Sequence, residues 1–502
     1  VGIHDNFFEL GGESILSIQV VSRARQAGVE VTTRDVFFSQ TVAGLAGCVG
    51  VEPASEFDGE VVVGPAPLTP IQRWFFTTFG ALAHFNQSFA MELAPDVDRD
   101  ALSVAVDAVV AAHPALRMRF SRWEGLWVQE PGAAAAGGVV LERCDLAGVA
   151  RGDRQAAVAA AALAVVSGLD IVDGPVARAV LFDFGSGQRP LLLLTAHHLV
   201  VDGVSWRILL GDLELAYQQA RIGRAVELDP VGTGFTQWAH RLVGHVQAGG
   251  LDEDLEYWSS LSDHTVPELP VAHSGANTAA SSRTLTVRLD REHTDALLHR
   301  VPGVYRTQIN DVLLSALGRV LAGWTGHDRV LIALEGHGRE EILPGMDLSR
   351  TVGWFTSLFP VSLSVGCADW GELLKSVKEQ LRAVPHRGLS YGALRYLTPD
   401  NELCGDACPQ ISLNYLGQWG AAGEPGGLYR DWVGGLAPDL AVESVRPYLL
   451  DVVGVVADGQ LQLTWTYSQD VHDEATVEWL ASEMCAALRG IVAHCADPGA
   501  GG

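Results

Sequence analysis

Positively charged side chains are scarce in this chain of 502 residues, which has 34 Lys and Arg against 60 Asp and Glu and a formal net charge of −26. No basic tract reverses the balance locally, and such a chain repels nucleic acid and anionic membranes at long range. Long apolar runs are also missing, since the longest, such as residues 190–196, are far too short to span a bilayer. We therefore expect no nucleic-acid partner and no membrane segment.

Cysteine is sparse as well. The seven Cys residues are odd in number and scattered along the chain, which argues against a disulfide framework and for a reducing cytoplasm. Cys404 and Cys408 form the only near pair, and no second half of a zinc site accompanies them. We expect free thiols, no metal and a cytoplasmic location.

The overall amino-acid composition is typical of a folded protein, with 48% apolar and 19% charged residues. The length exceeds what one hydrophobic core usually supports, so we expect two or more domains. The chain begins with Val1 and not Met, in what reads as a folded region, so we also expect it to be a piece of a longer protein.

Periodicity and turn signals predict helices and strands in alternation, and hence an α/β fold. Residues 1–48 are predicted to be helical, and residues 49–66, with their Gly, Pro and acidic side chains, to be a linker. In the region that follows, Thr69-Pro70-Ile-Gln72 has the composition of a helix start.

The first group of residues that could take part in catalysis is His197-His198, followed by Asp202-Gly203, at the end of a predicted buried strand. An imidazole at a strand end lies at the sheet edge and can exchange a proton near neutral pH. We expect Asp202 to fix the loop, Gly203 to permit a tight turn and Ser205 to cap the next helix. Two structural histidines would be the plainer interpretation of one His alone, but not of the whole string.

The second string is Glu335-Gly-His-Gly-Arg-Glu340, which follows a strand predicted over 330–334. A carboxylate at a strand end, flanked by glycine, can approach a substrate closely. For a lone Glu-Gly a polar turn is the default interpretation. Asn414 and Tyr415, after a later apolar segment, carry an amide and a hydroxyl that can orient a substrate.

The third string is Asp5-Asn-Phe-Phe-Glu-Leu-Gly-Gly-Glu-Ser14, ahead of a predicted helix. Two glycines before a helix N-terminus expose Ser14, and the helix end favours a phosphate. A Ser that only caps the helix would be the simpler interpretation if this string stood alone.

Together the three strings resemble the condensation-domain superfamily of nonribosomal peptide synthetases, which is related to chloramphenicol acetyltransferase. Residues 335–340 resemble the "EGHGRE" motif of its epimerization branch, and residues 5–14 resemble a carrier-protein attachment site. Residues 351–356 and 413–418 match late epimerization motifs. Residues 385–392 match another more loosely, because Ser390 stands where the family usually has Gly.

The resemblance implies two chloramphenicol acetyltransferase-like lobes with a central tunnel, preceded by part of a helical carrier domain. The expected divisions are 1–48 for the carrier part, 49–66 for the linker, 67–255 for the N-terminal lobe, 256–496 for the C-terminal lobe and 497–502 for the tail.

The resemblance also implies residue roles. Ser14 would carry 4′-phosphopantetheine covalently, and His198 and Glu335 would exchange protons on the two sides of an amino-acid Cα. Asp202 would be mainly structural, and the expected supporting residues are His197, Asp202, Gly203, Asn414 and Tyr415. Trp206, Trp354 and Phe355 are expected in the core.

The expected function is epimerization, from L to D, of the Cα of an aminoacyl or peptidyl thioester on the carrier. The expected partners are an upstream adenylation domain, a downstream D-selective condensation domain and a phosphopantetheinyl transferase. The alternatives are a condensation domain that forms peptide bonds, a non-catalytic module that docks carriers, and a free acyltransferase of the chloramphenicol type.

Overall fold

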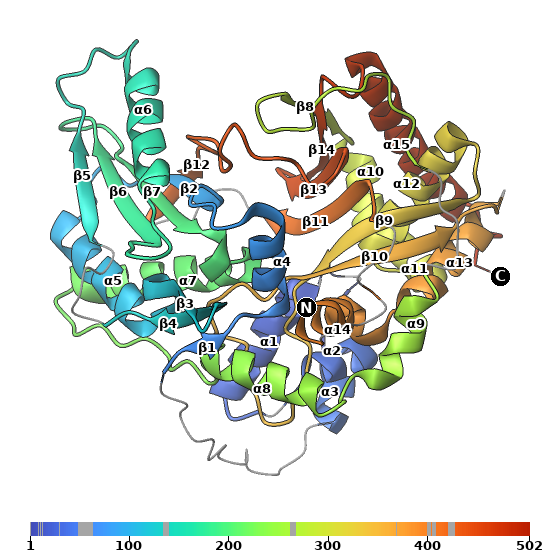
Figure 1. Cartoon of the computed structure of the whole chain (residues 1–502), viewed down its shortest axis with the longest axis horizontal. Coiled ribbons are helices and arrows are strands. Elements are labelled where there is room, and N and C mark those ends of the chain that lie inside the picture. The colour runs from blue at the N-terminus through green and yellow to red at the C-terminus, as the bar shows by residue number, and fades with distance from the viewer. Residues whose placement is uncertain are drawn as a thin grey trace.

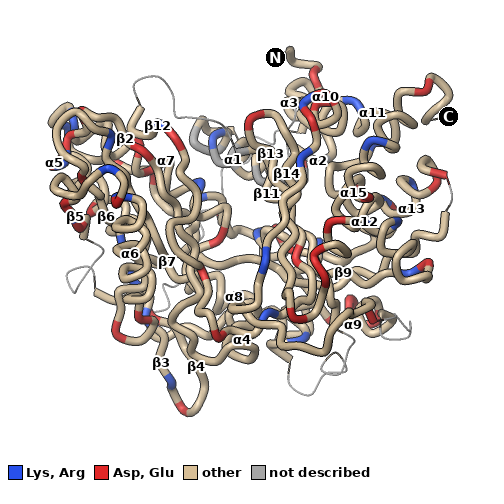
Figure 2. The backbone as a smooth tube through the Cα atoms, turned by 90° about the horizontal axis from the view of Figure 1, so that it is seen from above, with Lys and Arg blue, Asp and Glu red and all other residues tan. Residues whose placement is uncertain are grey.

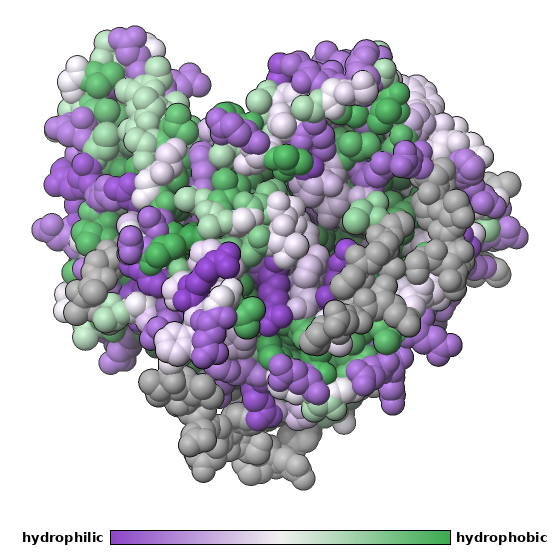
Figure 3. Space-filling model, viewed as in Figure 1, coloured by the Kyte–Doolittle hydropathy of each residue, from purple (hydrophilic) through white to green (hydrophobic). Residues whose placement is uncertain are grey.

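The computed structural model describes residues 2–8, 10, 12, 14–29, 31–48, 64–133, 140–261, 268–367, 369–398, 403, 408–419 and 427–501. Two lobes, each built on its own sheet, lie side by side, and three N-terminal helices lie against them (Figure 1). The space-filling view shows a notch between the lobes at the top of this face (Figure 3). Acidic positions are spread over both lobes (Figure 2).

The N-terminal region is helical, as predicted, with α1 (Ser14–Gln26), α2 (Thr33–Ser39) and α3 (Val42–Cys48). Val21, Val31 and Val36 form a small core of their own. Helix α2 starts with a capping box in which the Asp35 N–H donates to the Thr32 hydroxyl at 3.0 Å.

The first lobe is built on a five-stranded sheet in the order β12-β2-β7-β6-β5, antiparallel except between β5 and β6. Strand side chains alternate between two cores, one shared with α5 and α7 and the other with α6. The elements are β2 (Asn86–Leu93), β5 (Leu141–Asp145), β6 (Ala177–Asp183), β7 (Leu191–His197), β12 (Tyr429–Trp432), α5 (Arg99–Ala112), α6 (Arg154–Ser167) and α7 (Gly203–Arg221).

A smaller sheet in the order β1-β4-β3 and two further helices complete this lobe and its border. Pro70 is the first residue of α4, as predicted, and Gln72 accepts the Thr69 N–H at 3.0 Å. The elements are β1 (Ala66–Pro67), β3 (Met118–Trp123), β4 (Leu126–Pro131), α4 (Pro70–Phe79) and α8 (Phe235–Gln247).

The second lobe is built on a six-stranded sheet in the order β10-β9-β11-β13-β14-β8. Strand β11 runs parallel to both neighbours, β9 and β13, and the other pairs are antiparallel. The elements are β8 (Ser282–Arg288), β9 (Arg329–Gly336), β10 (Ser357–Ser364), β11 (Ile411–Trp419), β13 (Leu450–Ala457), β14 (Gln460–Ser468), α9 (Leu255–Ser259), α10 (Arg291–Asp295), α11 (Val301–Tyr305), α12 (Ile309–Thr325), α13 (Trp370–Arg382), α14 (Leu389–Leu397) and α15 (Glu474–Cys495).

The C-terminal half of the chain contributes one strand to the sheet of the first lobe. Strand β12 follows β11 in the sequence, yet it pairs with β2 of the first sheet, with Trp432 opposite Met91. The predicted division at residue 255 therefore does not separate the two sheets completely, because β12 lies beyond it. The linker and tail boundaries stay predictions.

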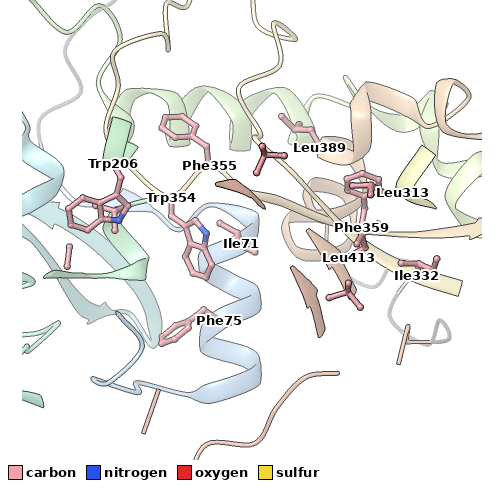
Figure 4. Packing of buried hydrophobic residues seen from close by; sticks show 14 of the residues in the cluster. Ile71, Phe75, Trp206, Leu313, Ile332, Trp354, Phe355, Phe359, Leu389 and Leu413 are labelled. Atoms are coloured by element: carbon pink, nitrogen blue, oxygen red, sulfur yellow. The ribbon is translucent and has the colours of Figure 1, made fainter. Parts of the chain in front are cut away.

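Large apolar side chains fill the junction between the lobes (Figure 4). Trp206 and Trp354 are each 3% exposed and Phe355 is 2% exposed, as expected for core residues. Cys408 and the other described cysteines form no disulfide, and Cys404 lies outside the described residues.

Candidate active site at the junction of the lobes

His198 follows the last residue of β7 and begins a short 3-10 turn. Its Nδ1 lies 2.9 Å from the Val201 carbonyl oxygen and its Nε2 lies 2.8 Å from the Gln87 amide nitrogen. The ring stacks on Phe85 at 5.4 Å between centroids and contacts the Trp354 ring at 4.4 Å. The imidazole is therefore held at both nitrogens and packs against two aromatic rings that also contact each other.

These contacts define which nitrogen of His198 carries the proton. The Trp206 indole N–H, which can only donate, lies 3.0 Å from Gln87 Oε1, so the NH₂ group of Gln87 faces His198. Nε2 accepts from that NH₂, and Nδ1 donates to Val201. Burial lowers the pKa of His198, so the ring is neutral near pH 7 with Nε2 as its basic nitrogen.

His197 has a different position from its neighbour. It is fully buried, its Nε2 donates to the Leu82 carbonyl at 2.9 Å, and its Nδ1 accepts the Leu199 N–H at 3.2 Å. Burial lowers the pKa of His197 to about 3. Both ring nitrogens are used by backbone groups, so His197 shapes the turn that presents His198.

Glu335 is the penultimate residue of β9, in the second sheet. Leu413 of β11 lies opposite Leu334 in the parallel pair, which brings Asn414 next to Glu335. The Asn414 amide donates to Glu335 Oε2 at 2.7 Å. The sequence placed Asn414 near the site, and the structure brings the two together.

The environment of Glu335 favours its neutral form. Solvent can reach the side chain, yet it lies among many protein atoms, and this burial raises the pKa of Glu335 to about 7. The negative charge of Asp451, on β13, adds to the shift. Near neutral pH both the acid and the carboxylate are therefore available, which is what acid–base catalysis requires.

Asp202 joins the two lobes by a buried ion pair. Arg339 donates to its two carboxylate oxygens at 2.7 and 3.1 Å, and the Phe355 N–H donates at 3.0 Å. Burial alone would raise the pKa of Asp202, but the charge and hydrogen bonds of Arg339 outweigh it and lower the pKa. Asp202 stays ionised and fully occupied, which fits the structural role that the resemblance implies.

This ion pair links the segments that carry His198 and Glu335, since each partner lies four residues after one of them. Gly338 permits the link: its φ is 66°, and a Cβ there would come within 1.7 Å of the Phe355 carbonyl oxygen. The two predicted strings are thus one structural unit.

Of two expectations about the turn after His198, the helix cap at Ser205 is wrong and the special role of Gly203 is not supported. The helix cap is Asp202, whose carboxylate accepts the Ser205 N–H at 2.7 Å, and Ser205 lies inside α7. Gly203 is the first residue of α7, and a Cβ there would meet no atom within 4 Å. The argument that this position needs glycine for a tight turn finds no support in the geometry.

Tyr415 is not brought to Glu335. Successive strand side chains point to opposite faces, so Tyr415 faces away from the side on which Asn414 meets Glu335. It pairs with Gly454 of β13, and its ring lies 3.3 Å from where a Cβ of that glycine would stand.

A cavity of about 240 Å³ lies at the junction, between α4, α8, β10 and α14. On one wall Trp74 packs edge-on against Trp354, which contacts His198. On another wall is Tyr448, whose pKa is raised well above its usual value by burial and by the charge of Glu335. Neither His198 nor Glu335 lines this cavity: Trp74 and Trp354 lie between it and His198, and Glu335 is the cross-strand partner of Leu358 on its wall.

Sequence reasoning assigned no role to Gln87, Arg339 or Tyr448. Arg339 lies inside residues 335–340, a string that the resemblance had marked, but its role there was not predicted. Tyr448 lies in no such string, and only the fold brings it to the cavity wall.

The carrier region has a glycine turn ahead of the helix that begins at Ser14. Ser14 is the first residue of α1, where free helix N–H groups favour a phosphate. The Gly12 N–H donates to the Phe7 carbonyl at 2.8 Å, and a Cβ at Gly12 would come within 2.5 Å of that oxygen. The tight turn ahead of α1 therefore requires glycine.

Helix α1 lies against α8 and against the segment that follows β9. Ile18 and Val21 are 3% and 2% exposed, and they line a small gap of about 20 Å³ together with Trp238, Leu343 and Met346. The carrier region therefore lies against the segment that begins at Arg339.

Within the described part of the chain, no group of three His, Cys, Asp or Glu side chains could hold a metal ion. No described helix has the length and apolar character needed to cross a membrane.

Two protein families match the sequence. The family described as "Condensation domain" matches residues 62–500, and the one described as "Phosphopantetheine attachment site" matches residues 1–49. The chain is 40% identical to chondramide synthase cmdD of Chondromyces crocatus, over 99% of this chain but 13% of that protein. It is 34% identical to tyrocidine synthase 1 of Brevibacillus parabrevis, over 99% of this chain and 46% of that protein. It thus spans less than half the length of these relatives.

A solved structure agrees with this result. The epimerization domain from the third module of tyrocidine synthetase B is 34% identical with a TM-score of 0.81, covering 88% of this chain and 98% of that one. The condensation domain of the monacolin K polyketide synthase MokA is 20% identical with a TM-score of 0.70, covering 87% and 99%. The two-lobed fold and the carrier region expected from the sequence are confirmed.

Proposed function

Because this chain belongs to the condensation-domain family of nonribosomal peptide synthetases and carries a phosphopantetheine attachment site ahead of that domain, we propose that it is an epimerization domain. It would invert the Cα of an aminoacyl or peptidyl thioester held by phosphopantetheine on Ser14. The thioester acidifies the Cα–H because the resulting carbanion delocalises into an enolate.

The observation that carries this proposal is the second proton-exchanging group, Glu335. Inversion at a planar carbon needs an acid and a base on its two sides, or one group that moves. Neutral His198 has the lone pair of a base, and Glu335, with a pKa raised to about 7, has an exchangeable proton at working pH. The two lie on different sheets that the Asp202–Arg339 ion pair holds together.

In the proposed reaction the substrate Cα loses one proton and gains another. One of the two groups takes the Cα proton, and the other delivers its own proton to the opposite face. When His198 is the base and Glu335 the acid, the neutral pair ends as an imidazolium and a carboxylate. The bound phosphopantetheine presents the thioester to these groups. The residues of this chain orient the arm and move the protons.

A condensation domain is the second candidate, because it would use His198 in the same fold. It would have no need for a carboxylate of raised pKa at position 335. The similarity to a solved epimerization domain, at 34% identity, favours the first candidate over condensation domains such as MokA at 20%, whose likeness shows the fold alone.

The proposed partners are those of a synthetase module. An upstream adenylation domain would supply the amino acid, a phosphopantetheinyl transferase would modify Ser14, and a downstream D-selective condensation domain would take the product. These partners would be met in the cytoplasm.

The test is exchange at Cα. A panel of L-aminoacyl and dipeptidyl pantetheine thioesters, deuterated at Cα, is incubated with the full chain, and deuterium washout and chirality are measured. Wild type should release deuterium and form the D epimer, and Glu335→Gln and His198→Ala should each slow formation of the D epimer at least about 100-fold.

Matched controls use exposed positions, Glu478→Gln on α15 and His327→Ala, and both should keep wild-type rates. Wild-type washout by both Glu335→Gln and His198→Ala would refute the assignment. A new amide bond without washout would identify a condensation domain.

A further inference from the structure

The basic nitrogen of His198 is in contact with Gln87, on β2 of the first sheet. Nδ1 of His198 is already occupied by the Val201 carbonyl, so Nε2 is the only ring nitrogen left to exchange a proton with a substrate. The Gln87 NH₂ group lies on that lone pair at 2.8 Å. A base whose lone pair is already occupied cannot take a proton until its partner moves.

The orientation of the Gln87 amide is fixed from its other side. Trp206 is buried at 3% exposure on α7, and its indole N–H donates to Gln87 Oε1 at 3.0 Å. A flipped amide would place two donors face to face at Trp206 and two acceptors at Nε2. The hydrogen bonds of this chain, which we call the relay, can therefore run in only one direction. It runs from Trp206 through Gln87 to His198 and ends at the Val201 carbonyl.

From this relay we infer that Gln87 is a positioning residue that fixes His198 as the Nδ1–H tautomer and covers its Nε2 until the substrate arrives. The inference rests on the proposed role of His198 as a proton-exchanging group. No bond changes in the resting relay; on substrate binding the amide leaves Nε2, and the Cα proton takes its place.

The titratable groups near His198 have other hydrogen-bond partners. The charge of Asp202 raises the pKa of His198, but the Asp202 carboxylate is bound by Arg339. His197 is bound by the backbone, and His84 Nε2 donates to the Pro438 carbonyl at 2.7 Å. Among the hydrogen bonds of the described residues, only that of Gln87 meets Nε2 of His198.

Three substitutions would change the hydrogen bonds of the relay in different ways. In Gln87→Glu, a carboxylate would accept from Trp206 and from Nε2–H, which favours the imidazolium and raises the pH at which His198 titrates. In Trp206→Phe the constraint on Oε1 is gone, so the amide can turn and its oxygen can favour the Nε2–H tautomer. Gln87→Leu removes the polar contact altogether.

The experiment is ¹⁵N NMR of the full chain labelled at histidine, with His198 assigned from the difference with His198→Gln. We expect wild type to show a protonated Nδ1 and an unprotonated Nε2, Trp206→Phe to shift the tautomer toward Nε2–H, and Gln87→Glu to raise the titration midpoint of His198 by at least about one pH unit. Gln155→Glu, at an exposed position on α6, should match wild type.

An Nε2–H tautomer in wild type, or an unchanged tautomer and midpoint in Trp206→Phe, Gln87→Leu and Gln87→Glu alike, would overturn the inference. Washout measured in parallel should fall about tenfold in Gln87→Glu at neutral pH. The NMR result needs no substrate, so absence of washout in wild type would refute the proposed function and leave the relay standing.

Discussion

The two candidate groups of this site are held in opposite ways. His198 has both nitrogens hydrogen-bonded and packs against two aromatic rings, whereas Glu335 meets one amide and can be reached by solvent. The first arrangement fixes a tautomer and a ring plane. The second shifts a pKa while leaving the side chain accessible. In a site that exchanges two protons, His198 thus provides a rigidly oriented group, and Glu335 provides a group that changes protonation state near neutral pH.

The largest expected effect follows from removing the bond between these two regions. Asp202→Asn leaves Arg339 charged and buried without its partner, which should cost about 3–5 kcal/mol of unfolding free energy. Thermal or denaturant unfolding of the full chain measures this loss. Arg189→Ala breaks an exposed ion pair with Glu92, and it should cost no more than about 1 kcal/mol. Equal losses in the two variants would contradict the linking role of Asp202.

The pH dependence of epimerization tests whether Glu335 is the titrating partner. The active pair holds one proton, and above the pKa of about 7 Glu335 loses it, so single-turnover rates in both directions should fall as the pH rises through 7. Below that pH the rate should be level until His198 becomes protonated. A profile that stays flat from pH 6 to about pH 9 would contradict the role of Glu335.

Asp451→Asn should move this profile to lower pH. The negative charge of Asp451 raises the pKa of Glu335, so removing it should lower that pKa and with it the pH at which the rate falls. The side chain keeps its size and can still accept from Ser412. The rate profile of this variant, measured beside wild type, should be displaced toward acid, and displacement toward alkali would contradict the electrostatic account.

Asn414→Leu should move the profile in the opposite direction and by less. The amide donates to the carboxylate at 2.7 Å and favours its charged form, so its removal should raise the pKa of Glu335. The expected displacement is toward alkaline pH. An unchanged profile would show that the Asn414 contact has no electrostatic effect on Glu335.

The smallest effect is expected at Gly203. A Cβ there meets nothing within 4 Å, so Gly203→Ala at the start of α7 should change the unfolding free energy by less than about 1 kcal/mol. Gly338→Ala is the contrast, because its Cβ would overlap the Phe355 carbonyl and its φ of 66° suits glycine. Similar losses in both variants would contradict this distinction.

Much of this architecture could be predicted because local sequence determines it. The strand before His197, the helix that begins at Pro70 and the helices of the carrier region follow from periodicity and caps. The resemblance supplied the two lobes. It placed Glu335 and Asn414 near one substrate, and the parallel register of β9 and β11 now explains why they meet.

Other features depend on contacts between distant parts of the chain. The pairing of β12 with β2 joins residues from opposite ends of the domain, and no local pattern signals it. The cap at Asp202 and the relay through Gln87 depend on which side chain reaches which backbone group after folding. Tyr415 was expected at the site because it adjoins Asn414, but strand alternation places it on the other face.

The most direct measurement is a single-turnover reaction with an L-configured, Cα-deuterated substrate on the phosphopantetheine arm of the full chain, in ordinary water. The account predicts that every D-configured product molecule has lost its deuterium, and that Glu335→Gln abolishes D product while His198 keeps its tautomer. D product that retains deuterium, or D product formed at the wild-type rate without the Glu335 carboxyl group, would contradict it.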